Sequence, residues 1–158
     1  MRTAIAGALS LALAAVGTTA SAATEQLAIT AQFVVTELGE EIALPDGRKL
    51  RIGMQNHAAV VNDQTGEVTS QWCSGHEHLD AAGASMATAG YCTVFYDSGD
   101  VLWLSFTGTT NDQPGTWTVM GGLGKYAGAT GGGTFKTTSM RSDGFALTQT
   151  GTGTVTTK

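Results

Sequence analysis

Three histidines are the most direct candidates for chemistry in this sequence. His76 and His78 flank Glu77, and residues two apart in an extended chain point to the same face. Two imidazoles at that spacing would suit a divalent metal, with His57 from another segment and Asp80 as further ligands. Histidine pairs at ligand spacing are also common without a metal. Metal binding is therefore an alternative hypothesis, and the sequence predicts no cofactor.

Two carboxylates are the candidates for general acid or base catalysis. Glu67 alternates with apolar neighbours and would face a polar lumen or solvent, while Glu37 follows the first expected strand. A carboxylate in an apolar cavity has a raised pKa and can exchange protons with a substrate. Charged side chains are far more often solvated. The sequence contains no Ser–His–Asp order, nucleophile elbow or phosphate-binding loop, and it favours a non-catalytic protein.

Four aromatic residues are candidates for binding a small ligand. Trp72, Trp103, Trp117 and Tyr126 are amphipathic, and the indole N–H of a buried Trp needs a partner, which favours positions near the mouth of a cavity. An aromatic-lined pocket for a small hydrophobic molecule is one interpretation, and simple core packing is the other.

The N-terminal segment has the pattern of a signal peptide. Arg2 precedes an uncharged Ala- and Leu-rich run, and Ala20-Ser21-Ala22 supplies the small residues of a cleavage site. The run is too short to span a membrane. We therefore expect residues 1–22 to be removed and residues 23–158 to form one exported domain, in the periplasm or outside the cell.

Export determines how the two cysteines are interpreted. Cys73 and Cys92 are the only cysteines, and outside the cytosol a lone pair usually forms a disulfide.

The net charge of -5 leaves no basic surface for nucleic acid. No later segment is apolar enough to span a membrane.

Short segments of alternating hydrophobicity predict strands throughout the domain. Leu50, Ile52 and Met54, for example, alternate with Lys49 and Arg51. Strands at hairpin spacing in a chain of this size indicate an antiparallel sandwich or a closed barrel, and closure removes exposed edges. We expect a single all-β antiparallel closed barrel of about eight strands. Residues 79–89 are expected to form a loop with one helical turn, and 151–157 suit either a strand or a frayed tail. The expected strands are 27–35, 50–54, 58–61, 68–73, 91–96, 101–107, 116–120, 134–139 and 145–150.

A glycine-rich segment follows the strand that ends at Met120. Gly122-x-Gly124-x-x-Ala127 matches a dinucleotide-binding fingerprint, but the surrounding glycines oppose the helix that this site requires. The segment is instead expected to form a long connection between two strands, in which Tyr126 anchors the loop to the barrel mouth. Its structural glycines are Gly121, Gly122, Gly124, Gly128 and Gly131.

The run Gly121–Gly131, with a Thr-Trp-Thr-Val strand before it and a Gly-Thr-Phe strand after it, resembles the signature of allene oxide cyclase-like and dirigent-like barrels, here as an exported bacterial member. The resemblance implies an eight-stranded calycin-like barrel with a central cavity, often in homodimers or homotrimers. The signature carries no catalytic residue. We therefore expect a barrel that binds a small hydrophobic ligand or acts as a non-catalytic envelope module. A cyclase or isomerase that folds a reactive intermediate in the cavity is the enzymatic alternative.

Overall fold

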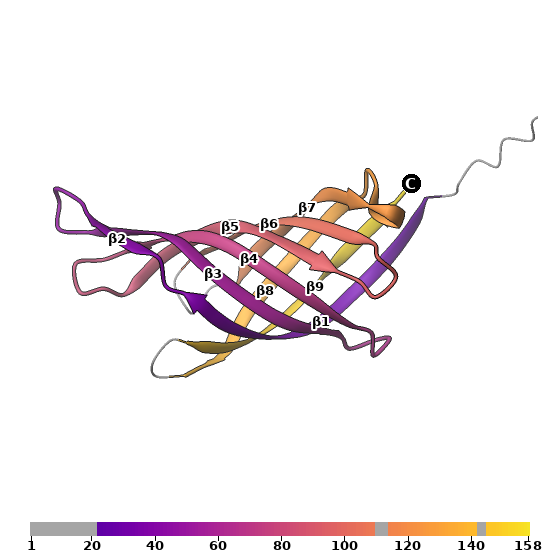
Figure 1. Cartoon of the computed structure of the whole chain (residues 1–158), viewed down its shortest axis with the longest axis horizontal. Helices are drawn as coiled ribbons and strands as arrows, with labels where there is room; N and C mark the ends of the chain where they lie inside the picture. The colour runs from indigo at the N-terminus through magenta and orange to yellow at the C-terminus, as the bar shows by residue number, and fades with distance from the viewer. Residues whose placement is uncertain (1–21, 110–113, 142–144) are drawn as a thin grey trace, which may run out of the picture.

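The computed structural model describes residues 22–109, 114–141 and 145–158, and the predicted signal peptide lies outside these ranges except for Ala22. The described chain is almost entirely extended (Figure 1). The strands are β1 (Ala23–Glu37), β2 (Glu40–Ala43), β3 (Lys49–Asn62), β4 (Val68–Leu79), β5 (Ser85–Phe95), β6 (Val101–Thr109), β7 (Gly115–Leu123), β8 (Thr130–Met140) and β9 (Ala146–Thr157), and one 3-10 turn, η1 (Gly124–Tyr126), follows β7.

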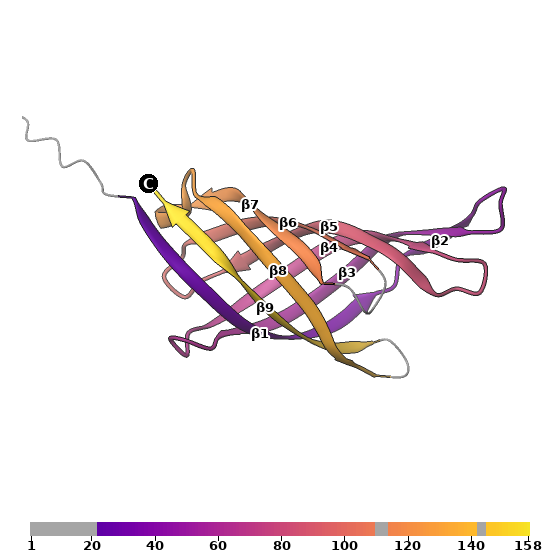
Figure 2. The same cartoon turned by 180° about the vertical axis from the view of Figure 1, so that it is seen from behind.

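Eight of the described strands close into an antiparallel barrel. Their order is β1-β9-β8-β7-β6-β5-β4-β3, and β1 pairs with β3 to complete the ring. The short β2 pairs with β3 outside the ring. Figure 2 shows the wall made by β1, β9 and β8 from behind. The predicted all-β closed barrel is confirmed.

Strand β1 closes the barrel because it is long enough to pair on both edges. Ala23–Val34 pairs with β9, and Ile29–Glu37 pairs with β3. Ala31, Phe33 and Val35 are buried, whereas the residues between them are exposed. This period of two is the pattern from which the strand was predicted.

A bulge in β3 reverses its inward face. Gly53 has a φ of 77°, and the register between β3 and β4 shifts between Ile52 and Met54. Because one extra residue reverses the alternation, Arg51 lines the interior with Met54, and Ile52 is exposed. The single apolar face expected for residues 50–54 is therefore broken.

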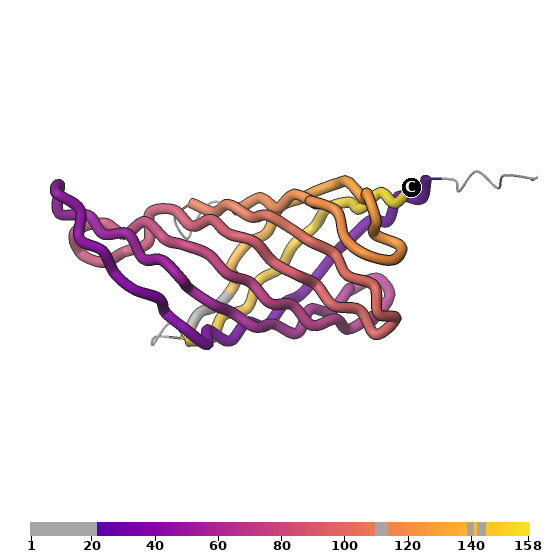
Figure 3. Tube along the Cα trace, turned by 45° about the horizontal axis from the view of Figure 1, so that its top comes forward, coloured from indigo at the N-terminus to yellow at the C-terminus, as the bar shows by residue number. Residues whose placement is uncertain are grey.

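Two further expectations are corrected or resolved by strand pairing. Residues 79–89, expected as a loop with a helical turn, form the tight hairpin of β4 and β5, because Ser85 and residues 87–89 pair with β4 and residues 87–89 also pair with β6. Residues 151–157 belong to β9, which is held between β1 and β8. Figure 3 shows the β2–β3 and β4–β5 hairpins reaching beyond the barrel at one end.

The glycine-rich connection is shorter than expected. β7 continues to Leu123 and β8 begins at Thr130, so only residues 124–129 link them. Gly124 and Gly128 have positive φ in this link, as its turns require. Gly131–Gly133 lie within β8. No helix in the described ranges is long and apolar enough to cross a membrane.

Candidate functional site

The barrel encloses a cavity of about 400 Å³, and all eight strands of the ring contribute to its wall. The volume falls within the range of small-molecule sites in proteins. Side chains reach the cavity because alternate residues of each strand point inward. Most of the wall is apolar, and its larger members include Leu27, Ile29, Phe33, Val60, Val94, Leu102, Leu104, Phe106, Trp117, Phe135 and Leu147.

The predicted disulfide is present and forms part of this wall. Cys73 in β4 and Cys92 in β5 lie directly opposite each other, with their Cα atoms 4.0 Å apart, and are bonded. Both cysteines are buried and line the cavity. The amide nitrogen of Gln71 donates to Cys73 Sγ at 3.0 Å. The disulfide thus joins two neighbouring strands at the middle of the cavity.

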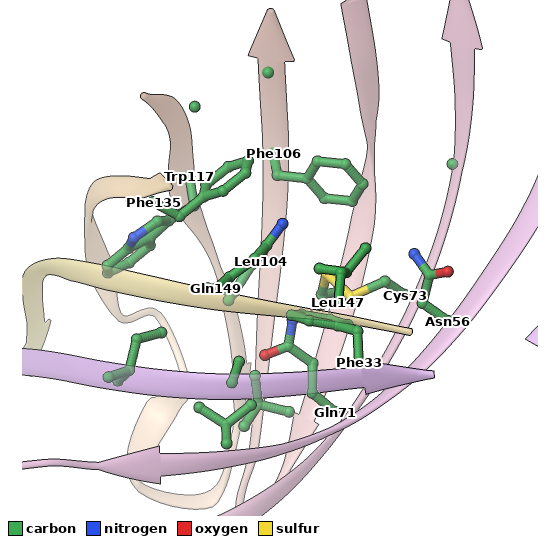
Figure 4. A pocket seen from close by; sticks show the side chains of 18 of the residues that line it. Phe33, Asn56, Gln71, Cys73, Leu104, Phe106, Trp117, Phe135, Leu147 and Gln149 are labelled. Atoms are coloured by element: carbon green, nitrogen blue, oxygen red, sulfur yellow. Dashed lines mark hydrogen bonds between the residues drawn. A yellow bond between two sulfur atoms is a disulfide. The ribbon is translucent and has the colours of Figure 1, made fainter. Parts of the chain in front are cut away.

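Two cavity-lining polar atoms have no hydrogen-bond partner. Within the described ranges, the buried side-chain atoms without a partner are Asn56 Oδ1 and Trp117 Nε1. Figure 4 shows both side chains among the apolar groups of the wall. Buried polar groups are normally paired, so these two atoms mark where a bound molecule would gain hydrogen bonds.

Glycines on the neighbouring strands fix the position of the Trp117 ring. A Cβ at Gly153 would lie 2.3 Å from Trp117 Cζ2, and one at Gly133 would lie 2.7 Å from the same atom. Trp117 is 7% exposed. The indole therefore occupies the space left by missing side chains in β8 and β9, and even alanine at Gly153 would displace it. The close approach of a ring to the strand backbone explains these glycines, whose φ values are not positive.

An ion pair lies at the end of the cavity near β2. Arg51 Nη1 donates to Glu77 Oε2 at 2.9 Å, and Arg51 Nη2 donates to Glu41 Oε1 at 2.6 Å. Hydrogen bonds from Arg51 and then from Lys49 lower the pKa of Glu41. Both Arg51 and Glu77 line the cavity. Their opposite charges compensate each other at this end.

Two tyrosines close the opposite end of the cavity. The rings of Tyr96 and Tyr126 lie 4.8 Å apart, and Lys125 Nζ is 4.8 Å from the Tyr126 ring centroid. Burial raises the pKa of Tyr126 to about 12, and burial likewise raises the pKa of Tyr96. The backbone N–H of Lys125 donates to Asp100 Oδ1 at 3.0 Å and lowers the pKa of this carboxyl. The link 124–129 is thereby held over this end.

The four aromatic residues proposed for ligand binding lie in different places. Trp117 lines the cavity. Tyr126 is 1% exposed and packs beneath its loop against Tyr96, which itself lines the cavity. Trp72 and Trp103 lie on the outer face of the barrel, 44% and 39% exposed, because their neighbours Cys73 and Leu102 take the inward positions.

The three histidines are all exposed on strands rather than in a loop. His76 and His78 share the outer face of β4, with ring centroids 5.9 Å apart. His57 of β3 pairs with Trp72 of β4, and Trp72 lies four residues before His76. About 13 Å along the strand therefore separates His57 from His76. Among the described residues, no group of three or more His, Cys, Asp or Glu could hold a metal ion.

Of the two carboxylate candidates, only Glu67 lines the cavity. It is exposed in the turn before β4, at the end of the cavity near Tyr96. Glu37 is exposed at the end of β1, where its carboxylate accepts a hydrogen bond of 2.9 Å from Gln55 Nε2.

Asn56, Arg51 and Glu77 are among the polar residues of the cavity that sequence reasoning missed. The parity of β4 could have identified Glu77, because it shares a face with Gln71 and Cys73. Arg51 required knowledge of the Gly53 bulge. Asn56 lies in a segment that was not assigned a buried face.

Two solved structures share this fold at low sequence identity. The pterocarpan synthase dirigent protein PsPTS1 matches with a TM-score of 0.57 and 12% identity, over 85% of this chain and 96% of its own. The pterocarpan synthase dirigent protein GePTS1 matches with a TM-score of 0.56 and 10% identity, over 89% of this chain and 88% of its own. The sequence matches no protein-family model and no curated protein. The chain therefore has a dirigent-like barrel fold.

Proposed function

We propose that this protein binds one small, largely apolar molecule inside the barrel and does so without catalysing a reaction. The observation that carries the proposal is the cavity of about 400 Å³ with a mainly apolar wall. Both similar structures are of dirigent proteins named for the synthesis of a small molecule, which supports a small-molecule role for the fold.

The size and chemistry of the wall support this proposal. Protein interiors normally contain few voids larger than a water molecule, so a cavity of this size costs stability unless it is filled. The apolar wall would gain free energy by removing a hydrophobic ligand from water. Disulfide-linked strands and the closed hydrogen-bond ring would hold the cavity open in the free protein.

Filling the cavity with protein atoms is expected to abolish ligand binding. Val60 lines the cavity, and the adjacent Ala59 is exposed on the outer face of the same strand. The fluorescence of the uncharged dye N-phenyl-1-naphthylamine, which increases in apolar surroundings, would report binding. We expect Val60→Trp to weaken dye binding by about tenfold or more, because the added ring takes the volume that the dye needs.

The matched control is Ala59→Trp, which adds the same ring outside the barrel and should leave dye binding unchanged. Thermal unfolding of both variants would show that they remain folded. Failure of the wild-type protein to bind the dye, or equal binding by Val60→Trp, would contradict the proposed function.

A buried carboxylate that faces the cavity and is free to exchange a proton would favour the cyclase or isomerase alternative. Glu77 is a carboxylate of the cavity wall, but its Oε2 is committed to Arg51 at 2.9 Å. Glu67 is solvated at one end. Neither arrangement favours catalysis over binding.

We also propose that the protein acts outside the cytosol, as the disulfide and the N-terminal segment suggest. The denatured mass of protein purified from its host would test this, because cleavage after Ala22 removes a defined mass. Assembly into homodimers or homotrimers remains a prediction, which the native mass would test.

A further inference from the structure

The two unpaired polar atoms of the cavity lie on opposite walls. Asn56 belongs to β3 and Trp117 to β7, and these strands are four positions apart in either direction around the ring of eight. In Figure 4 the two side chains lie on opposite sides of the view, with Leu104 and Leu147 between them. A single molecule that spans the cavity can therefore meet both atoms.

The chemistry of the two atoms differs. Trp117 Nε1 is a donor only, so it needs an oxygen or nitrogen acceptor. Asn56 Oδ1 is an acceptor that needs an N–H or O–H donor. A hydroxyl fits Asn56 best, because it can donate to the amide oxygen and accept from the amide nitrogen of the same side chain.

The charges of the wall are confined to its two ends. Arg51 and Glu77 form an ion pair at one end, and Glu25 and Glu67 are at the other. Between these ends the described lining residues are uncharged. A charged ligand group in the middle would lose its hydration without finding a counter-ion, so the site favours a neutral molecule.

Resting on the proposed function, we propose that the ligand is an uncharged molecule with an apolar body and an oxygen function near each end. A hydroxyl at one end donates to Asn56 Oδ1, and an oxygen at the other end accepts from Trp117 Nε1. The apolar body lies against the Phe33, Leu104 and Leu147 side chains of the wall. Two separate water molecules bound to the same atoms are the competing explanation.

The test measures how linear diols displace N-phenyl-1-naphthylamine from the cavity. Hexane-1,6-diol, octane-1,8-diol and decane-1,10-diol cover a range of spans, and each is compared with the alcohol in which a methyl replaces one hydroxyl, such as nonan-1-ol. The variants are Asn56→Leu, which replaces the amide with an apolar group of similar size, and Trp117→Phe, which keeps a ring but removes the donor.

We expect the best-fitting diol to bind about fivefold more weakly to each single variant and about 25-fold more weakly to the double variant, since each change removes one hydrogen bond. The matched alcohol can use whichever partner remains, so it should lose no more than about twofold in either single variant. The dianion octanedioate should not displace the dye. Dye affinity and thermal unfolding are measured for each variant, so that diol affinities are compared between folded proteins whose own dye affinity is known.

The outcomes separate this inference from the function beneath it. If the wild-type protein does not bind the dye, the proposed function fails. If the dye binds but diol affinities are the same in the wild-type protein and both variants, water satisfies the two atoms. In that case the inference is overturned while the binding function stands.

Discussion

Replacing Tyr126 with alanine is expected to lower the free energy of unfolding by about 3–5 kcal/mol, as for other large buried aromatic residues. Tyr126 is 1% exposed and is among the most deeply buried side chains described. Its ring contacts Tyr96 at a centroid distance of 4.8 Å, and Lys125 Nζ lies over both rings. The Tyr126 side chain also anchors the link 124–129 to the barrel. Its loss would leave a cavity that the closed barrel cannot collapse to fill.

Tyr126→Phe provides the matched control. This variant keeps the ring and removes only the Tyr126 hydroxyl, at an expected cost of about 1 kcal/mol. Urea unfolding of the three proteins would measure the differences. Equal destabilisation by the two variants would contradict the packing role, because it would assign the effect to the hydroxyl alone.

Removal of the disulfide is expected to produce the second large effect. The double variant Cys73→Ala/Cys92→Ala should lose about 3 kcal/mol of unfolding free energy on the chain-entropy model. The two cysteines are 19 residues apart, so the bond restricts a loop of this length in the unfolded chain. Urea unfolding under oxidising conditions would measure the loss.

The reduced wild-type protein is the control for this prediction. It keeps both sulfur atoms in the cavity wall, so it separates the loss of the cross-link from the loss of side-chain volume. We expect reduction alone to cause most of the destabilisation. If reduced and oxidised wild-type proteins unfold at the same urea concentration, the stabilising role of the bond is wrong.

Strand content could be predicted from the sequence because alternation is a local property. The residues 27–35 show a period of two, and the structure places Ala31, Phe33 and Val35 inside. The same logic failed at residues 50–54, where the Gly53 bulge reversed the faces. It also failed at 79–89, where pairing with β4 and β6 overrode a composition that suits a loop.

The candidate site was less predictable than the fold. Trp117 lines the cavity, whereas Trp72 and Trp103, which were proposed for ligand binding on the same ground, lie on the outer face of the barrel. An amphipathic side chain such as Trp suits either the inner or the outer face of a strand. Its position in the inward–outward alternation of the strand therefore decides which face it occupies. The histidine pair likewise shares one face, as its spacing requires, but that face is the outer one.

By itself, the sequence determined that the chain forms antiparallel strands, that its two cysteines can pair, and that glycines are needed between Met120 and Thr134. These properties follow from side-chain period, cysteine number and backbone freedom, all of which act over a few residues. The tertiary structure alone decided that β1 joins β3, that Asn56 and Trp117 oppose each other, and that a cavity remains between them. Closure of the ring brings together residues that are far apart in the sequence, and no local sequence pattern specifies which distant residues will meet.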